Sequence, residues 1–168
     1  GNRNNTRCSG GYNGTGGSVL AGTQDNASAR TTTPTLATWT GIATGDGGPS
    51  AITPNSSPTQ FIEGNTALLV TTDAFASVLR DITPPSPHPL FTPPMIVVPS
   101  TATPSQPTVY YGGKDLWRTT NPTSMSPPWT KRTRAAGFVT AIAVAPSDPT
   151  GRYVGFKNGP LQGSAAGG

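Results

Sequence analysis

Two aspartates in glycine-rich segments are the residues of this chain best placed for chemistry. Asp25 lies in Gly22-Thr-Gln-Asp-Asn26 and Asp46 in Thr44-Gly-Asp-Gly-Gly48, where glycine lets a backbone and a ligand approach closely. Glycosidases use two carboxyl groups, about 5–5.5 Å apart for retention or about 6.5–9.5 Å apart for inversion. Asp25 and Asp46 are therefore weak candidates for a catalytic pair, and the favoured interpretation is that each caps a turn.

The same segments supply the candidate ligand-binding residues. Gln24, Asp25, Asn26 and Asp46 offer hard oxygen atoms of the kind that Ca²⁺ prefers, so a Ca²⁺ or ligand contact is the alternative to turn capping. Trp117 joins this set as a platform on which a sugar could stack. Packing between neighbouring sheets is nevertheless the favoured interpretation of all three tryptophans.

The other reactive side chains form no catalytic or metal-binding constellation. His88 is the only histidine and stands between two prolines, which indicates an exposed loop. Cys8 is the only cysteine, so an internal disulfide is excluded, while a free thiol or a bond to another chain stays open. We expect no metal site and no cofactor apart from the Ca²⁺ alternative.

The composition narrows the fold class. Glycine (21) and proline (19) make up about 24% of the 168 residues, against a usual ~12%. Both residues oppose helices, and no run approaches the ~18 apolar residues of a membrane-spanning helix. Two fold classes remain: a disordered chain and a turn-rich β protein.

The net charge is +4, but the basic residues cluster only at Lys131, Arg132 and Arg134. We interpret that cluster as a solvated strand end, with an anion contact as the alternative, and expect no nucleic-acid partner.

Internal repeats decide between disorder and β structure. The segment from Phe61 to Asp73 matches the segment from Val109 to Asn121 at an offset of 48 residues, with Gly64 over Gly112 and Leu68 over Leu116. Short apolar runs end at prolines spaced 45 and 47 residues apart: Pro54, Pro99 and Pro146. A third anchor comprises Trp39 to Ile42, Leu79 to Ile82 and Trp129 to Arg132. Four short strands per ~45 residues is the size of a β-propeller blade.

Two segments resemble a known family. The stretch from Leu116 to Trp129 looks like a degenerate Asp-box turn, whose pattern is Ser-x-Asp-x-Gly-x-x-x-x-Trp between the third and fourth strands of a blade. The stretch from Ala141 to Gly159 is similar to a blade start. The chain thus resembles the BNR/Asp-box β-propellers, sortilin-like and xyloglucanase-like, of secreted bacterial proteins. The segment Thr71-Thr-Asp-Ala-Phe-Ala-Ser-Val keeps the Asp but lacks the Gly and the Trp.

The expected fold is all-β: propeller blades of four-stranded antiparallel sheets, about three to four blades, forming an incomplete propeller. We expect a flexible lead at 1–17, blades within 18–164 and a Gly-rich tail at 165–168. The blade boundaries fall at 18–48 (partial), 49–92, 93–138 and 139–164 (partial). We expect one ring of Tyr110 and Tyr111 to face the core and the other to be exposed.

The leading function is a non-enzymatic extracellular or cell-surface module for binding or structural assembly, with carbohydrate, protein or itself as partner. The alternative is a fragment of a secreted polysaccharide-active glycoside hydrolase. Expected partners are further blades of the same polypeptide or copies of the chain, and no membrane span is expected. Glycosylation sequons occur at Asn4, Asn13, Asn26 and Asn55 and carry little weight in a chain this rich in Asn, Ser and Thr.

Overall fold

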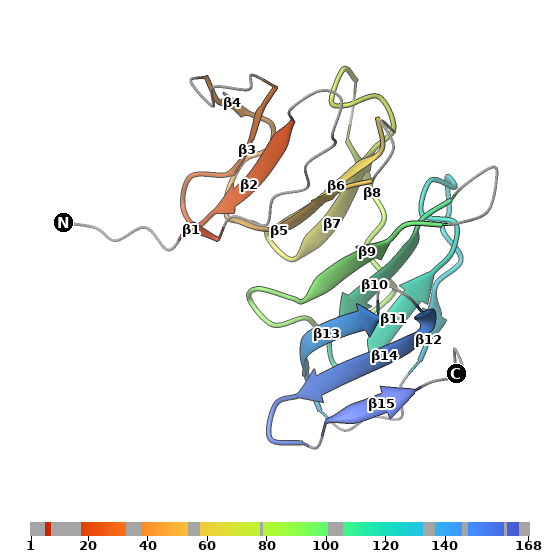
Figure 1. The fold of residues 1–168 in the computed structure, drawn as a ribbon. Helices are drawn as coiled ribbons and strands as arrows, with labels where there is room; N and C mark the ends of the chain where they lie inside the picture. Colours follow the sequence, from red (N-terminus) through yellow and green to blue (C-terminus); the bar gives the residue numbers. More distant parts are fainter. Residues whose placement is uncertain are drawn as a thin grey trace. The chain divides into compact units, whose positions relative to one another are not determined.

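The computed structural model describes residues 6–7, 18–32, 38–53, 58–77, 79–100, 106–132, 137–145, 148–159 and 161–164. All regular elements within these ranges are β-strands, arranged in four antiparallel sheets (Figure 1). None of the described segments forms an apolar helix of membrane-spanning length. The chain divides into two compact units, Gly1–Thr83 and Pro84–Gly168, each containing two sheets.

The first unit contains two four-stranded meanders. One runs in the order β1 (Thr6–Arg7), β2 (Val19–Thr23), β3 (Ser28–Thr31) and β4 (Thr40–Gly41). The other follows as β5 (Gly47–Ile52), β6 (Gln60–Gly64), β7 (Ala67–Thr71) and β8 (Arg80–Asp81). Sequential strands pair throughout, which is the connectivity of a propeller blade.

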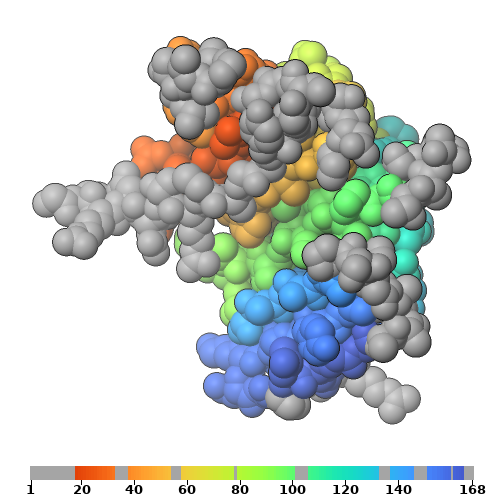
Figure 2. Space-filling model, in the orientation of Figure 1, coloured from red at the N-terminus to blue at the C-terminus, as the bar shows by residue number. Residues whose placement is uncertain are grey.

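The second unit repeats this plan. Its first sheet contains β9 (Met95–Val98), β10 (Thr108–Gly112), β11 (Leu116–Thr119) and β12 (Thr130–Lys131). Its second sheet has three strands: β13 (Val139–Ala145), β14 (Asp148–Phe156) and β15 (Gln162–Ser164). The atoms of this last sheet are blue in Figure 2.

The 48-residue repeat coincides with equivalent strands. Gly64 and Gly112 end the second strands β6 and β10, and Leu68 and Leu116 lie in the third strands β7 and β11. The third sequence anchor falls on the short fourth strands β4, β8 and β12. Pro99 directly follows β9 as expected, whereas Pro54 and Pro146 lie outside the described residues.

The first sheet begins inside the segment that the sequence predicted to be a flexible lead. The predicted lead 1–17 contributes Thr6–Arg7 to the first sheet, where Thr6 pairs with Thr23 and Arg7 with Gly22. The rest of that lead lies outside the described residues, together with Cys8, the tail 165–168 and the sequons at Asn4, Asn13 and Asn55.

Each unit has its own apolar core. In the first, Leu20, Ile52 and Ile62 are buried, with Leu69 and Phe75 among the partly buried residues packed against them. In the second, the buried residues come from both sheets: Tyr110, Leu116, Val139, Val154 and Phe156. Full burial of such side chains stabilises a fold by roughly 1.5–3 kcal/mol each.

One detail differs from the sequence-based expectation. Tyr110 and Tyr111 occupy successive positions of β10, yet both rings are buried. Alternation places them on opposite faces of the strand, so the blade is covered on both faces at this point. The prediction of one exposed tyrosine is therefore wrong.

Candidate functional site

The structure brings the Asp25 and Asp46 segments together. Asp25 lies in the turn between β2 and β3, with φ of 62°, and Asp46 precedes β5. One carboxylate oxygen of Asp46, Oδ1, accepts a hydrogen bond from the backbone N–H of Asp25 at 2.7 Å. The Asp46 side chain thus caps a neighbouring turn, which is the interpretation that the sequence favoured for this residue.

A third segment, the β6–β7 turn, joins this cluster through Asn65. Its Oδ1 accepts a hydrogen bond from the Asp46 backbone N–H at 3.1 Å, and its own N–H donates to the Asp46 carbonyl at 3.0 Å. The Asn65 amide also donates to the Thr44 carbonyl at 3.4 Å. We call Asp25, Asp46 and Asn65, with their turns, the turn cluster.

The remaining predicted ligand-binding residues lie in different surroundings. Gln24 and Asn26 are exposed beside Asp25, and the Asn26 amide donates to the Gln24 carbonyl at 3.3 Å. Trp117 is half-buried on β11 in the second unit, and its buried indole N–H has no hydrogen-bond partner among the described residues. The structure therefore groups four of the five predicted ligand-binding residues, and Trp117 belongs to a separate unit.

A buried acid beside the turn cluster was missed by the sequence analysis. Glu63 on β6 is 1% exposed, and its Oε1 has no hydrogen-bond partner among the described residues. Burial raises the pKa of Glu63 to about 7; the negative charge of Asp46 also raises it, and a hydrogen bond from the Thr66 backbone opposes the shift. Glu63 is thus a protonatable group near neutral pH, a property that catalytic acids share.

The sequence did contain a signal for this residue. All five residues of β6 are buried, from Gln60 to Gly64. A strand covered on both faces has no solvent side, so a glutamate in its middle must be desolvated. Two successive apolar residues, Phe61 and Ile62, indicate a strand that is buried on both faces. A strand with alternating polar and apolar residues would instead place Glu63 on a solvent-exposed face.

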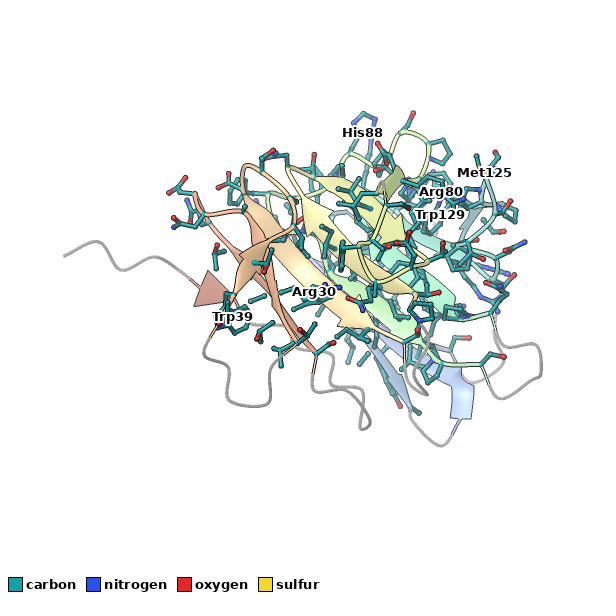
Figure 3. All side chains as sticks on the ribbon, turned by 90° about the horizontal axis from the view of Figure 1, so that it is seen from above. Arg30, Trp39, Arg80, His88, Met125 and Trp129 are labelled. Atoms are coloured by element: carbon teal, nitrogen blue, oxygen red, sulfur yellow. The ribbon has the colours of Figure 1, made fainter. Side chains whose placement is uncertain are left out.

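A cavity of about 320 Å³ lies between the two sheets of the first unit. We call it the first-unit pocket. It combines polar groups with apolar side chains, and its lining residues are Arg30, Thr40, Gly41, Ile42, Phe75, Ser77 and Leu79. Arg30 and Trp39 both belong to the first blade (Figure 3). Trp39 is 41% exposed and directly precedes Thr40, the residue that pairs with Arg30.

The turn between β7 and β8 shapes one wall of this pocket. Thr71 Oγ1 donates to Asp73 Oδ1 at 2.7 Å and accepts from the Phe75 N–H at 3.1 Å. The hydrogen bonds from the Ser77 side chain and, to a smaller extent, the Thr71 side chain lower the pKa of Asp73. Phe75 has φ of 66°, a left-handed conformation at the place where the Asp-box pattern has glycine. Phe75 therefore keeps a strained backbone while its ring lines the pocket.

Among the described residues, the first-unit pocket is lined by neither a carboxylate nor a histidine. Within the described ranges, no group of three or more His, Cys, Asp or Glu side chains is placed to hold a metal ion. The Ca²⁺ contact at Asp25 and Asp46 therefore stays a prediction. His88 is exposed in a loop, as expected.

No known protein family and no curated protein sequence matches this chain. Its fold does resemble solved structures, one of which is the crystal structure of an ancestral GH74 enzyme, with a TM-score of 0.63 and 14% sequence identity. The match covers 90% of this chain and 21% of the enzyme, so the chain spans about a fifth of that enzyme's length.

At this level of identity the similarity shows the fold alone. The four meanders and this structural neighbour together establish an all-β protein built of β-propeller blades.

Proposed function

We propose that this chain is a non-enzymatic part of an extracellular β-propeller and that it binds carbohydrate in the first-unit pocket. The observation that carries the proposal is the pocket itself. Its volume of about 320 Å³ falls in the usual range of about 300–1,000 Å³ for small-molecule sites. It offers apolar walls together with a few polar groups, which is the usual character of such sites.

The pocket side chains suit a neutral sugar. Arg30 is held in place, since it donates to the Ala74 carbonyl and lies 5.4 Å from the centre of the Phe75 ring. Thr40 adds a hydroxyl group that can both donate and accept hydrogen bonds, and the Ser77 hydroxyl, which donates to Asp73, can still accept one. Trp39, beside Thr40, is an exposed aromatic platform at the same blade edge.

The acids support binding without hydrolysis. Among the described lining residues of the pocket there is no carboxyl group. Asp46 caps a turn, Asp73 bonds within its own turn, and Glu63 is fully covered. Because glycoside hydrolysis needs two carboxyl groups flanking the bond, this arrangement favours a binding module over a hydrolase.

Isothermal titration with a panel of neutral β-glucan oligosaccharides tests this proposal. Thr40 offers a blocking position, because it pairs with Arg30 and therefore shares a face of the sheet with that pocket residue. We expect Thr40→Phe to fill the pocket and Trp39→Ala to remove the platform, each lowering affinity about tenfold or more. Phe91→Ala, which removes an exposed aromatic ring in the second unit, is the matched control. Unchanged affinity in both pocket variants, or no binding of any oligosaccharide, rejects the proposal.

A polysaccharide-active enzyme is the second candidate. Two observations favour it: the structural neighbour is a GH74 enzyme, and Glu63 has a pKa of about 7 beside Asp46. Hydrolysis of the same glucan panel by the wild type, abolished in Asp25→Asn, Asp46→Asn or Glu63→Gln, supports this candidate. Absence of hydrolysis with intact binding supports the leading proposal.

The expected partners are further blades of the same polypeptide or a second copy of the chain. The last sheet presents small residues and one ring to solvent: Ala141 and Ala143 on β13, and Tyr153 on β14, which is 58% exposed. Tyr153 pairs with Ala143, so they share this outer face. Light scattering at several concentrations tests self-association, and a strictly monomeric result excludes it.

A further inference from the structure

The second unit contains a small cavity with an unusual lining. Its volume is about 170 Å³, and Arg132, Arg152, Gln162 and Ser164 contribute to its walls together with Leu116 and Val154. These residues come from β11, β14, β15 and the position just after β12. Two arginines and two neutral polar residues therefore meet around one space, which we call the second-unit cavity.

Arg152 is the most notable of these residues. It is 4% exposed, and its Nη1 has no hydrogen-bond partner among the described residues. Its guanidinium carbon lies 5.7 Å from the centre of the Tyr110 ring, so the aromatic face supports the cation. Buried charges are normally paired, and a cation with an open donor is matched best by an anion.

Arg132 offers a second open donor at the same cavity. Its Nε is buried and has no partner within the described residues, and its backbone N–H is fixed by the Leu116 carbonyl at 2.8 Å. The acid next to Leu116 in sequence is Asp115: its Oδ2 binds Lys131 Nζ at 2.7 Å, and its Oδ1 is buried without a partner among the described residues. Among the described residues, no salt bridge joins a carboxylate to Arg132 or Arg152.

The charge distribution of the chain also favours anion binding in the second unit. Residues 84–168 contain seven lysines and arginines and two aspartates, whereas residues 1–83 contain four arginines and five acids. The basic excess of the whole chain therefore resides in the second unit. Such an excess draws anions towards this unit before any specific contact forms.

We propose that the second-unit cavity binds a small oxyanion, with Arg132 and Arg152 as the charged ligands and Gln162 and Ser164 as neutral hydrogen-bonding partners. The planar guanidinium group matches the oxygens of a carboxylate, a sulfate or a phosphate. The anion could be the carboxylate of an acidic sugar or a free inorganic ion. The proposal does not depend on sugar binding in the first-unit pocket.

The test uses isothermal titration of the whole chain with three probes: D-glucuronate, inorganic sulfate and neutral D-glucose as the control. We expect saturable binding of at least one anion, weakened about tenfold or more in Arg132→Gln. Lys157→Gln removes one exposed cation of the same unit and serves as the matched control, with little change expected. Arg152→Lys keeps the charge but loses the planar fork, so it should also weaken binding.

The probes distinguish the two sources of the anion. Binding of glucuronate without sulfate identifies an acidic sugar, and equal binding of both identifies a site for any small oxyanion. Thr40→Phe should leave anion binding unchanged, which separates this site from the first-unit pocket. The proposal is overturned if neither anion saturates the protein, or if Lys157→Gln weakens binding as much as Arg132→Gln.

Discussion

The carboxyl group of Glu63 lies against the α-carbon of Gly48, in the space that a side chain at position 48 would fill. The strands β5 and β6 create this arrangement with a bulge. Gly47 pairs with Gly64 and Ser50 with Ile62, so Gly48 and Pro49 together face the single residue Glu63. A bulge of this kind re-aims a side chain, and here it accompanies a buried acid within the sheet.

Replacement of Gly48 should therefore be costly. In Gly48→Ala the new methyl group would collide with Oε2 of Glu63, and Gly22 packs against the Gly48 backbone on the neighbouring sheet. We expect a loss of about 2 kcal/mol or more in the free energy of unfolding, measured by urea denaturation. Gly41→Ala is the control, since its Cβ meets open space. Equal stability of the two variants would contradict the packing described here.

The buried Glu63 also predicts how stability depends on pH. Its pKa rises from 4.5 to about 7 in the folded state, so the folded protein holds this proton more tightly than the unfolded chain does. The free energy of unfolding that depends on this proton is fully present below about pH 4.5. It falls as the pH rises from there to about 7. The expected loss is on the order of 3 kcal/mol.

Urea denaturation between pH 4 and pH 8 measures this dependence. Glu63→Gln should flatten the pH profile and be more stable than the wild type at pH 8, because a neutral amide carries no desolvated charge. Asp25→Asn, which changes an exposed acid of the turn cluster, should keep the wild-type slope. A wild-type slope in Glu63→Gln would show that another group titrates.

The strand repeat could be predicted from sequence because it depends on local chemistry. Glycine-containing turns and apolar residues at fixed offsets placed Gly64, Gly112, Leu68 and Leu116 at equivalent positions in two blades. The placement of Asp25 and Asp46 in glycine-rich turns rested on the same chemistry, whereas the contact between the two turns joins neighbouring sheets. These features need only the order of residues along each strand and turn.

Other features depend on how two sheets pack, and the sequence pattern does not encode that. Arg132 and Arg152 are 20 positions apart and meet at one cavity only because β12 and β14 belong to sheets that share a core. Tyr111 is buried because the blade is covered on both faces. Alternation along one strand describes a single sheet with one solvent-exposed face. It therefore did not predict the burial of Arg152, of a second tyrosine or of Glu63.

The Thr71 hydroxyl should stabilise the β7–β8 turn. It is buried, donates to Asp73 Oδ1 and accepts from the backbone N–H groups of Asp73 and Phe75. Thr71→Val keeps the shape but leaves these groups unpaired, so we expect a loss of about 2 kcal/mol in urea denaturation.

Two further measurements separate this role from a general packing effect. The pKa of Asp73, measured by NMR, should rise towards its ordinary value in Thr71→Val, because a hydrogen bond to the carboxylate is lost. Thr119→Val in the next blade is the control. Among the described hydrogen bonds, Thr119 Oγ1 makes one, which it accepts from the Asn121 N–H at 3.2 Å. We therefore expect a smaller loss in the free energy of unfolding for Thr119→Val. An unchanged Asp73 pKa would rule out the proposed bonding.

Strain in the same turn leads to a prediction of increased stability. Ala74 and Phe75 have φ of 55° and 66°, so two successive residues other than glycine adopt the left-handed conformation. That conformation costs roughly 1–2 kcal/mol per residue with a side chain. Ala74→Gly should relieve part of this cost while it keeps the carbonyl that Arg30 binds. We expect the free energy of unfolding, measured by urea denaturation, to rise by about 0.5–1 kcal/mol.

Ala76→Gly is the control, because Ala76 lies two residues further along and has no positive φ. Its free energy of unfolding should fall by up to about 1 kcal/mol, since glycine increases the entropy of the unfolded chain. If both variants lose stability equally, the left-handed conformation at Ala74 is not a source of strain.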